Sequence, residues 1–580
     1  MHKNVSVPAF VFKPITTDHT TKETIKRQDD VLEIEFPVFE KEEVLKIAET
    51  LSFRKRRAHD RPIDEVIDIM DQVGALWMNP NYDIRKEVME VITMTTGQSQ
   101  SLCELELIQN VGIWNRKPLE AFLAEELGGK KYLDSWVPSG TMKLHAQPRG
   151  VVLHNIAGNA FNVGMLSLFF GLITKNVNLV KLPREEPYFT EKFAESIGEV
   201  DKKIAKEIAV LYWSGSKSEI YDELFNSGNI DCVLAWGGLT SIEDIRRRAY
   251  RFGIKVIDHG PKMSFSIISE EMLTDTELMQ SVAQKLATDV AIWNQKACLS
   301  PRVVYIKEKS TQPLNSNGFK GISEKSTEND SILLRNTQSA STNDDKSDSL
   351  FSFGKTSTDI TDLMQRSLKL LRNEITDSSP LGFAKILADS MKKIDVQYPR
   401  AYMTQADGMA MAKKREYFAM KYEIKDEAII LTPKKNPLNW TVVYLRNPPT
   451  LEEIDMCQDR FIVVTRIANI QDLVHFLRRE KLLQYLQTFS IYGTDQFVED
   501  VAEELSLLGA ARFPRVGEHN LQKIGAPWDG HYVLNDMVRW VEIGFLTQEG
   551  TEEVDRKDMM MQFNREDPTQ QMNGNMTQDF

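Results

Sequence analysis

The chain has 580 residues, 42% of them hydrophobic and 27% charged, and a formal net charge of −13. This composition is typical of a soluble globular protein, and the length predicts two or more domains. The acidic balance argues against a general nucleic-acid binder, because there is no basic excess to displace phosphate counterions. The most apolar run, Val163 to Thr174, is too short to span a bilayer, and the N-terminus has no signal-peptide pattern.

The four cysteines are widely spaced along the chain: Cys103, Cys232, Cys298 and Cys457. They form no CxxC pair and no disulfide framework, so we expect free thiols in a reducing cytoplasm and no metal site.

Residues 1–40 form a mixed N-terminal extension in which the alternating stretch Val31 to Phe36 is expected to be an edge strand. From about Lys41 to Leu127, apolar residues recur at three and four positions, which predicts helices. Residues 135–149 then read as a hairpin.

Strands and helices alternate after the hairpin. Because strands joined by helices of this length need right-handed crossovers, they predict a parallel sheet. We therefore expect a doubly wound α/β dinucleotide-binding domain over residues 41–262. The expected strands are 150–155, 178–182, 207–213, 231–236 and 254–257, and the expected helices are 161–174, one from about 188, 217–226 and 241–252.

A second α/β domain is expected over residues 263–306 and 359–546. The Ser/Thr/Asn/Asp/Lys-rich segment 307–358 has too few apolar residues to fold, which indicates a disordered insertion, either regulatory or simply tolerated. Residues 547–580 are polar and are expected to form a mobile tail.

Three strand ends carry candidate ligand-binding residues. The sequence VVLHNIAGNAFNVG (151–164) places Ala157, Gly158 and Asn159 after a buried strand, where a doubly wound sheet binds its ligand. No GxGxxG is present, and the asparagines of this segment are equally well explained as helix caps.

Lys181 ends the next strand, with Arg184 three residues further on, and this pair suits an adenosine ribose and a phosphate, or a solvated turn. Gly237 and Gly238 end a later strand just before a helix, an arrangement that favours an anion or forms a plain turn.

Cys298 lies in IWNQKACLSPR (292–302), in a loop between a predicted helix, Leu278 to Trp293, and a strand. A structural role is the ordinary expectation for a free cysteine, and the other three cysteines suit it because they lie in or beside regular segments. Cys298 differs because it has polar neighbours and a following proline, and the nearby Lys296 is expected to favour its thiolate.

In order and spacing, these pieces resemble the aldehyde dehydrogenase superfamily, and within it the LuxC-type acyl-CoA or acyl-protein reductases of luminous bacteria. The resemblance runs from about Glu42 to Phe545 without the insertion, and NQKACLSPR followed by VVYI points to the branch. It implies an aldehyde dehydrogenase-like fold whose hairpin at 135–149 is an oligomerisation arm, and therefore a homo-oligomer.

The resemblance also implies roles for individual residues. Cys298 matches the catalytic cysteine, and Asn159 matches the asparagine that helps to hold the oxyanion. Lys181 matches the lysine at the adenosine ribose. Gly237 and Gly238 match the small pair near the pyrophosphate, and Ala157 and Gly158 are expected to face the cofactor.

Three positions depart from the superfamily pattern. Arg184 stands where NAD-preferring members commonly have a glutamate, and arginine can bind a 2′-phosphate, which predicts NADPH. The segment that carries the hydrolytic glutamate reads Asp258-His259-Gly260-Pro261, so the usual base is absent or altered. No glutamate motif for the nicotinamide ribose is recognisable near Cys457 to Ile462.

The resulting hypothesis is reduction of an acyl thioester, either acyl-CoA or an acylated carrier or synthetase protein, to an aldehyde. The Cys298 thiolate would attack the carbonyl, Asn159 would stabilise the oxyanion, and hydride from NADPH would reduce the acyl-cysteine. His259 or Asp258 could carry a proton, or could belong to a capped turn. Two alternatives remain: oxidation of aldehydes with CoA, and a catalytically silent acyl carrier.

Overall fold

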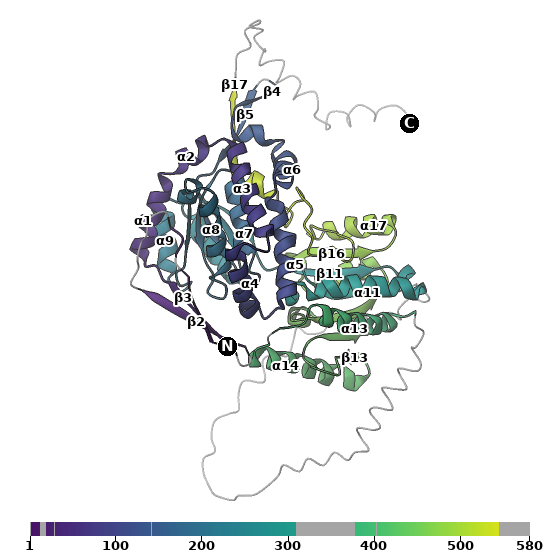
Figure 1. Cartoon of the computed structure of the whole chain (residues 1–580). Helices are drawn as coiled ribbons and strands as arrows, with labels where there is room; N and C mark the ends of the chain where they lie inside the picture. The colour runs from purple at the N-terminus through teal and green to yellow at the C-terminus, as the bar shows by residue number, and fades with distance from the viewer. Residues whose placement is uncertain are drawn as a thin grey trace, which may run out of the picture.

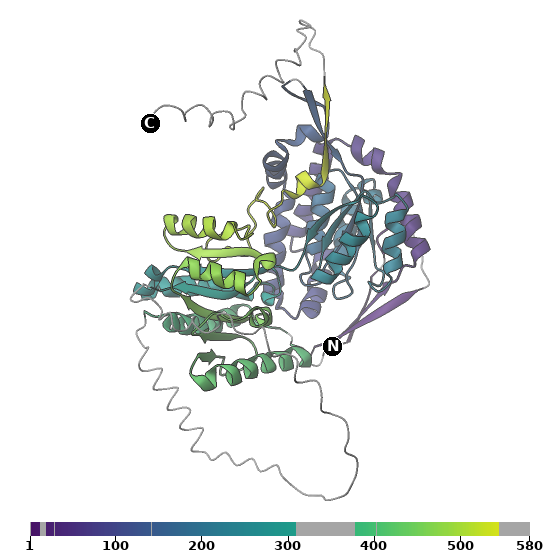
Figure 2. The ribbon, with the colours of Figure 1, turned by 180° about the vertical axis from the view of Figure 1, so that it is seen from behind.

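The computed structural model describes residues 2–7, 9–11, 19–27, 30–140, 142–308, 378–401 and 403–544. The predicted insertion at 307–358 lies outside these residues except for its first two positions, and the predicted tail at 547–580 lies wholly outside them. Within these ranges no helix is long and apolar enough to cross a membrane. Figures 1 and 2 show two lobes from opposite sides, each built around a sheet covered by helices.

Three strands near the N-terminus form a small sheet in the order β1-β3-β2. They are β1 (His2–Ser6), β2 (Thr20–Arg27) and β3 (Asp30–Pro37). The prediction of an edge strand at Val31 to Phe36 is wrong, because β3 lies in the centre, parallel to β1 and antiparallel to β2. The alternation in β3 was readable since one face is fully buried, whereas β2 is mostly polar and gives no such signal.

Six helices follow, which confirms the helical prediction for residues 41–127. They are α1 (Lys41–Ser52), α2 (Lys55–Asp60), α3 (Ile63–Met78), α4 (Asp83–Thr96), α5 (Gln100–Val111) and α6 (Arg116–Leu127), with the short 3₁₀ helices η1 (Gly112–Trp114) and η2 (Lys130–Leu133). In α3 the buried side chains Val66, Met70, Val73 and Trp77 recur at three and four positions, so one stripe of the helix faces the core.

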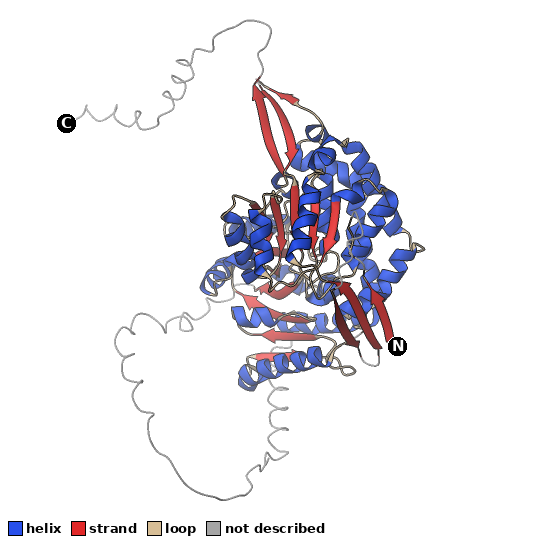
Figure 3. Ribbon diagram, turned by 90° about the vertical axis from the view of Figure 1, so that its left-hand side faces the viewer, coloured by secondary structure: helices blue, strands red, loops and turns tan. Residues whose placement is uncertain are grey.

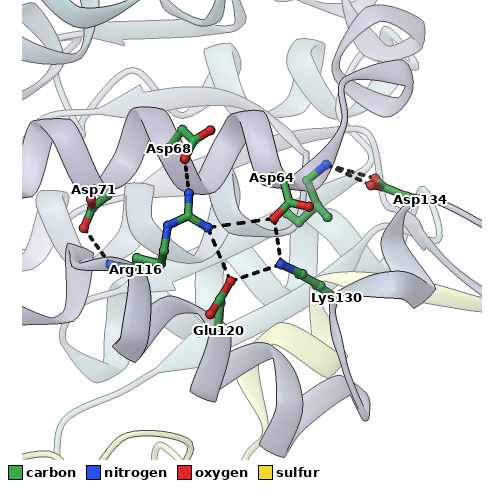
Figure 4. A network of polar contacts seen from close by, with 8 residues as sticks. Asp64, Asp68, Asp71, Arg116, Glu120, Lys130 and Asp134 are labelled. Carbon is green, nitrogen blue, oxygen red and sulfur yellow. Dashed lines mark hydrogen bonds and ion pairs between the residues drawn. The ribbon is translucent and has the colours of Figure 1, made fainter.

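A network of charged side chains joins α3 to α6 and η2 (Figure 4). Lys130 Nζ donates to Asp64 at 2.7 Å and to Glu120 at 3.0 Å, and the Arg116 guanidinium donates to Asp68 and Glu120. Exposed ion pairs contribute only about 0.2–1 kcal/mol each. Apolar packing therefore holds these helices together, and the network aligns α6 along α3.

The five-stranded sheet is parallel, in the order β10-β9-β6-β7-β8, which confirms the doubly wound arrangement. Its elements are β6 (Val151–Asn155), α7 (Val163–Ile173), β7 (Val177–Lys181), α8 (Phe189–Val200), η3 (Ile204–Glu207), β8 (Ile208–Leu211), α9 (Ser218–Asn226), β9 (Cys232–Trp236), α10 (Leu239–Tyr250) and β10 (Lys255–His259). Helices α1, α9 and α10 cover one face, and α3, α7 and α8 cover the other. Strand order reverses between β6 and β9, so a crevice opens at their carboxyl ends.

The six-stranded sheet has the order β13-β14-β15-β12-β11-β16, with β13 alone antiparallel to its neighbour. Its elements are β11 (Met263–Ile268), η4 (Glu270–Thr274), α11 (Thr276–Ala291), η5 (Ile292–Gln295), β12 (Pro301–Lys307), α13 (Pro380–Gln397), α14 (Gln405–Lys421), η7 (Glu423–Lys425), β13 (Ala428–Leu431), β14 (Thr441–Leu445), α15 (Leu451–Met456), β15 (Phe461–Ile467), α16 (Ile470–Arg479), η8 (Leu483–Tyr485), β16 (Leu486–Tyr492) and α17 (Asp495–Ser506). Helices α11 and α13 pack on one face, and α14, α16 and α17 pack on the other.

A third sheet projects from the lobe that is built around the five-stranded sheet (Figure 3). It contains the predicted hairpin, β4 (Val137–Ser139) and β5 (Met142–Pro148), together with β17 (Val538–Gly544). The short helix α18 (Val533–Asp536) precedes β17. β17 pairs with β5 in antiparallel register along its whole length, so the far end of the described chain extends the hairpin to three strands.

Candidate active site

The crevice between β6 and β9 opens into a cavity of about 470 Å³ at the carboxyl ends of the parallel strands. The turns after β6, β9 and β10 line one side, and the loop that carries Cys298 lines another. A segment near Trp528, from the C-terminal part of the chain, also lines the cavity. Cys298, Asn159 and His259, predicted from three separate motifs, therefore all line the same cavity.

The loop that carries Cys298 begins with three consecutive residues in the left-handed region: Trp293 (φ 58°), Asn294 (φ 47°) and Gln295 (φ 62°). None of them is glycine, so each costs about 1–3 kcal/mol of backbone strain. The predicted helix is thus interrupted after Ala291, and the chain turns sharply to bring the cysteine to the cavity.

Buried polar contacts hold this strained turn. Glu106 on α5 accepts the backbone N–H of Trp293 at 2.6 Å, and Arg460 Nε donates to Asn294 Oδ1 at 2.9 Å. The Gln295 amide donates to the Pro301 carbonyl at 2.8 Å and accepts from the Phe461 N–H at 2.7 Å. Each of the three strained residues therefore has its own buried partner, which orients the cysteine loop.

Cys298 is half-buried, with its carbonyl bound by Ser264 Oγ at 2.7 Å and its Sγ contacted by Gln487 Nε2 at 3.6 Å. Burial raises the pKa of its thiol to about 11, and the nearby Asp529 carboxylate adds to the increase. The expectation that Lys296 favours the thiolate is wrong, because its ammonium pairs with Asp459 at 3.5 Å instead. The resting cysteine is therefore a thiol.

The other three cysteines are fully buried, as their apolar surroundings predict. Burial raises the pKa of all three thiols, to about 12 for Cys232 and Cys457 and further still for Cys103. Cys298 is the one cysteine that borders the cavity.

Asn159 lies opposite the cysteine loop and donates from Nδ2 to the Lys296 carbonyl at 3.3 Å. Asn159 is exposed and lines the cavity, and its partner Lys296 lies on the same loop as Cys298. The two neighbouring asparagines have other roles. Asn155 accepts a hydrogen bond from the Tyr221 hydroxyl at 2.7 Å, which is a structural role. Asn162 directly precedes α7, and its side chain makes no capping hydrogen bond.

The cofactor candidates fall into two groups. Ala157, Gly158, Gly237 and Gly238 line the cavity. A Cβ at Gly158 would lie 2.9 Å from the Cβ of Glu185, so glycine lets the turns after β6 and β7 pack together. A Cβ at Gly238 would meet nothing within 4 Å. Gly238 directly precedes α10, and no side chain caps the N-terminus of that helix.

Lys181 and Arg184 lie just beyond the cavity, at the carboxyl end of β7. Burial lowers the pKa of Lys181, and the Glu185 carboxylate partly offsets this. Arg184 is mostly exposed, and its Nε donates to Glu23 on β2 at 2.7 Å. The structure brings the two predicted cations to the same strand end, with an acidic partner that the sequence did not indicate.

Asp258 and His259 point to opposite sides of the end of β10, because side chains alternate along a strand. The Asp258 carboxylate accepts hydrogen bonds from two nitrogens of the Arg246 guanidinium, at 2.6–3.0 Å. Asp258 does not line the cavity. His259 lines the cavity and stacks on Trp236 with ring centroids 4.0 Å apart.

Sequence reasoning missed two residues of the cavity region. Asp529 lines the cavity and binds His259 Nδ1 at 2.7 Å, and Gln487 links Asp529 to Cys298. The Asp529-Gly530 pair was a readable turn signal, but nothing local indicated that its carboxylate reaches His259. Among the described residues, no group of three or more His, Cys, Asp or Glu side chains is placed to hold a metal ion.

A family of known proteins resembles this chain in sequence. A sequence profile of the family described as Acyl-CoA reductase (LuxC) matches residues 58–317 and 371–540. The long-chain acyl-protein thioester reductase of Vibrio harveyi is 28% identical over 251 residues, 43% of this chain and 51% of that protein. The corresponding enzyme of Aliivibrio fischeri is 27% identical over 501 residues, 85% of each chain. The chain thus spans about half the length of the first relative and most of the second.

Solved structures show the same fold at low identity. A salicylaldehyde dehydrogenase from Pseudomonas putida G7 superposes with a TM-score of 0.63 at 13% identity, covering 95% of this chain and 100% of that one. An NADP-dependent glyceraldehyde-3-phosphate dehydrogenase from Bacillus halodurans C-125, complexed with NADP, gives a TM-score of 0.58 at 14% identity over 91% of this chain and 96% of that one. The architecture is therefore that of the aldehyde dehydrogenases.

Proposed function

The chain belongs to the Acyl-CoA reductase (LuxC) family, and from that premise we propose that it reduces a long-chain acyl thioester to the aldehyde through an acyl-Cys298 intermediate, with NADPH as reductant. The acyl donor is acyl-CoA or an acylated protein, as the names of the related thioester reductases suggest. The protein acts in the reducing cytoplasm, which suits its four free cysteines.

The observation that carries the proposal is the composition of the cavity around Cys298. Among the described residues that line it, Asp529 is the one carboxylate, and His259 and Gln487 both bind it. A thioester on Cys298 therefore lacks a free carboxylate to activate water beside it. Without that carboxylate one route to hydrolysis of the thioester is closed, and reduction of the acyl group is favoured over that route.

Asn159 is the proposed oxyanion donor. Its Nδ2 already reaches the Lys296 carbonyl, on the same loop as Cys298, so a small rotation would aim it at a carbonyl oxygen bound over the thiol. A preorganised donor of this kind typically contributes about a hundredfold or more in rate.

The residues at the crevice suit a dinucleotide. The uncapped N-terminus of α10, with open space at Gly238, suits a pyrophosphate, and Lys181 suits the adenosine ribose. We assign cofactor binding to residues 41–262 and catalysis to 263–306 with 359–546. When bound, the reduced nicotinamide would supply hydride to the acyl carbon.

Arg184 supports NADPH over NADH. Its ion pair with Glu23 is exposed on the arginine side, and such pairs contribute little, so a 2′-phosphate can take the place of the carboxylate at low cost.

The cavity suits a long acyl chain. Six large apolar side chains are among its lining residues: Ile113, Phe122, Val163, Leu166, Trp293 and Trp528. Burial of a methylene in such surroundings contributes about 0.8 kcal/mol, so each added carbon that fits increases affinity.

The projecting sheet of β4, β5 and β17 is the proposed oligomerisation arm. Trp540, Val541 and Ile543 on β17 remain more than a third exposed, although large apolar side chains are normally covered. We therefore propose a homo-oligomer, which light scattering of the purified protein would detect as a mass that is a multiple of 66.4 kDa.

Intact-protein mass spectrometry with hexadecanoyl-CoA tests the function directly. We expect one acyl adduct on Cys298 without cofactor, loss of that adduct with release of aldehyde on adding NADPH, and no adduct on Cys298→Ala. A stable adduct that NADPH leaves in place would indicate a silent acyl carrier, and absence of any adduct would refute the scheme. Aldehyde and CoA giving acyl-CoA, without reduction in the other direction, would indicate the oxidative enzyme.

A further inference from the structure

We infer that His259, oriented by Asp529, is the base that takes the proton from Cys298 during acylation and the acid that returns it to the departing thiol, with Gln487 as the residue that positions the pair. The inference rests on the proposed acyl transfer to Cys298. It assigns a catalytic role to one member of the Asp258-His259 pair and positioning roles to two residues from the other end of the chain.

One carboxylate connects the histidine to the cysteine. Asp529 accepts from His259 Nδ1 through Oδ2 at 2.7 Å, and its Oδ1 accepts from Gln487 Nε2. The same amide nitrogen contacts Cys298 Sγ at 3.6 Å. An amide NH₂ has two hydrogens, so Gln487 has one for the carboxylate and one for the sulfur.

Gln487 is itself fixed. Its Oε1 lies 3.4 Å from Ser264 Oγ, the hydroxyl that also donates to the Cys298 carbonyl. Because the single hydrogen of the Ser264 hydroxyl goes mainly to the Cys298 carbonyl, burial on β16 and the bond to Asp529 orient the Gln487 amide.

The contacts of His259 determine which of its ring nitrogens can accept a proton. Its ring stacks on Trp236, with the ring centroids 4.0 Å apart and 19° between the planes, and Trp528 meets it edge-on. Because Asp529 can only accept at Nδ1, the proton of neutral His259 sits on Nδ1, and Nε2 carries a lone pair. Nε2 is buried and has no hydrogen-bond partner within the described ranges, and His259 and Cys298 line the same cavity.

Asp529 occupies a rigid position. Trp528 and His531 exchange two backbone hydrogen bonds, of 2.8 and 2.9 Å, across a two-residue turn. Asp529 (φ 52°) and Gly530 (φ 83°) are both left-handed, as a type I′ turn requires. Asn-Gly and Asp-Gly are the favoured pairs for this turn, so asparagine at 529 preserves the backbone while removing the charge.

The cysteine needs a base because it rests as a thiol. With a pKa of about 11, only about one molecule in several thousand carries the thiolate at pH 7.5. The other ionisable groups at the cavity are cationic and engaged: Lys262 with the Gln484 carbonyl, Lys296 with Asp459, and Arg302 with Asp455. Arg512 also acts electrostatically on Cys298 and Asp529, and its side chain donates to backbone carbonyls.

Charge balance favours the same transfer. Asp529 opposes formation of a thiolate while His259 is neutral. Once His259 accepts the proton, the imidazolium and the carboxylate cancel, and the thiolate forms beside a neutral pair.

The step balances without any further reactant. As Sγ bonds to the acyl carbon, its proton passes to His259 Nε2. The tetrahedral intermediate collapses, the bond from carbon to the donor sulfur breaks, and the donor leaves as a thiolate. His259 then returns the proton to that sulfur, which yields acyl-Cys298 and a free thiol.

The test is the rate of acyl-Cys298 formation from hexadecanoyl-CoA, without cofactor, followed by quenched-flow mass spectrometry between pH 6 and 9.5. For the wild type we expect the rate to reach a plateau within this pH range, below the pH at which the unassisted thiol would ionise. For Asp529→Asn and His259→Gln we expect at least a hundredfold loss at pH 7 and a rate that keeps rising to pH 9.5. A matched control is Asp426→Asn, since Asp426 is also left-handed (φ 59°) but is exposed, just before β13 of the six-stranded sheet.

A wild-type rate and plateau in Asp529→Asn would overturn the inference, and so would a larger loss in Asp258→Asn than in Asp529→Asn. A thermal transition unchanged by Asp529→Asn shows that the loss is not one of folding. Failure of the proposed function is a separate result: Cys298→Ala would then still produce aldehyde, or the wild type would form no adduct at any pH.

Discussion

One of the buried groups that hold the strained turn before Cys298 is the Glu106 carboxyl group, and its removal gives the sharpest test of how the loop is held. Glu106 is completely buried on α5, and its Oε1 accepts from the Trp293 N–H at 2.6 Å and from Gln98 Nε2 at 2.5 Å. Glu106→Ala removes both bonds. Glu106→Gln keeps an acceptor oxygen in nearly the same place.

The magnitude follows from the two donors left buried. Each unsatisfied donor costs about 1–3 kcal/mol, so Glu106→Ala should lower the free energy of unfolding by about 2–6 kcal/mol. That loss is comparable to the strain of about 1–3 kcal/mol in each left-handed residue, so the turn should relax and misplace Cys298. Glu106→Gln should cost less than about 1.5 kcal/mol.

The two variants also differ in pH dependence. Burial, the dominant effect, raises the pKa of Glu106 to about 8 from an ordinary value of 4.5. The folded state therefore holds this proton more tightly than the unfolded state, so its contribution to stability is complete below pH 4.5 and is lost as pH rises through 8. At about 1.4 kcal/mol per tenfold difference in proton affinity, the full loss is on the order of 5 kcal/mol. Glu106→Gln should remove it.

Urea unfolding at pH 5 and pH 8, with the rate of Cys298 alkylation as a second readout, measures these effects. Glu49→Ala, an exposed glutamate on α1, is the control for losing a helical carboxylate. The reasoning is refuted if Glu106→Ala unfolds within 1 kcal/mol of the wild type, or if the wild type and Glu106→Gln lose stability equally between the two pH values.

Three further predictions concern the site itself. In His259→Gln, alkylation of Cys298 by iodoacetamide should accelerate up to a pH near 11, and a plateau near pH 7 in this variant would contradict the assignment of a resting thiol. Asn159→Ala should slow acylation of Cys298 about a hundredfold in stopped-flow assays while leaving the Kd for cofactor unchanged, and an unchanged rate would remove Asn159 from the oxyanion site. Arg184→Ala should weaken NADP binding roughly tenfold or more in calorimetry without affecting NAD, whereas equal effects on both would exclude a 2′-phosphate contact.

Much of the fold could be predicted because local patterns decide it. The helices between Lys41 and Leu127 and the alternation of strands and helices from 151 to 259 follow from hydrophobic periodicity, and the parallel pairing follows from the length of the connections. The place of Cys298, in a loop between a helix and a strand, was equally readable. So were the strand ends that bring Asn159 and His259 to one cavity, because carboxyl ends of parallel strands share an edge.

Only the tertiary structure decided which groups surround the cysteine. Lys296, a neighbour in sequence, pairs with Asp459, while Asp529 and Gln487, about 200 residues away, act on the thiol. The mostly polar strand β2 and the pairing of β17 with β5 likewise have no local signal. The physical reason is that periodicity reports which face of an element is buried, whereas hydrogen bonds and the pKa of Cys298 depend on distances that folding alone sets. The sequence predicts a thiolate at Cys298, whereas the folded chain holds a half-buried thiol whose proton needs a partner.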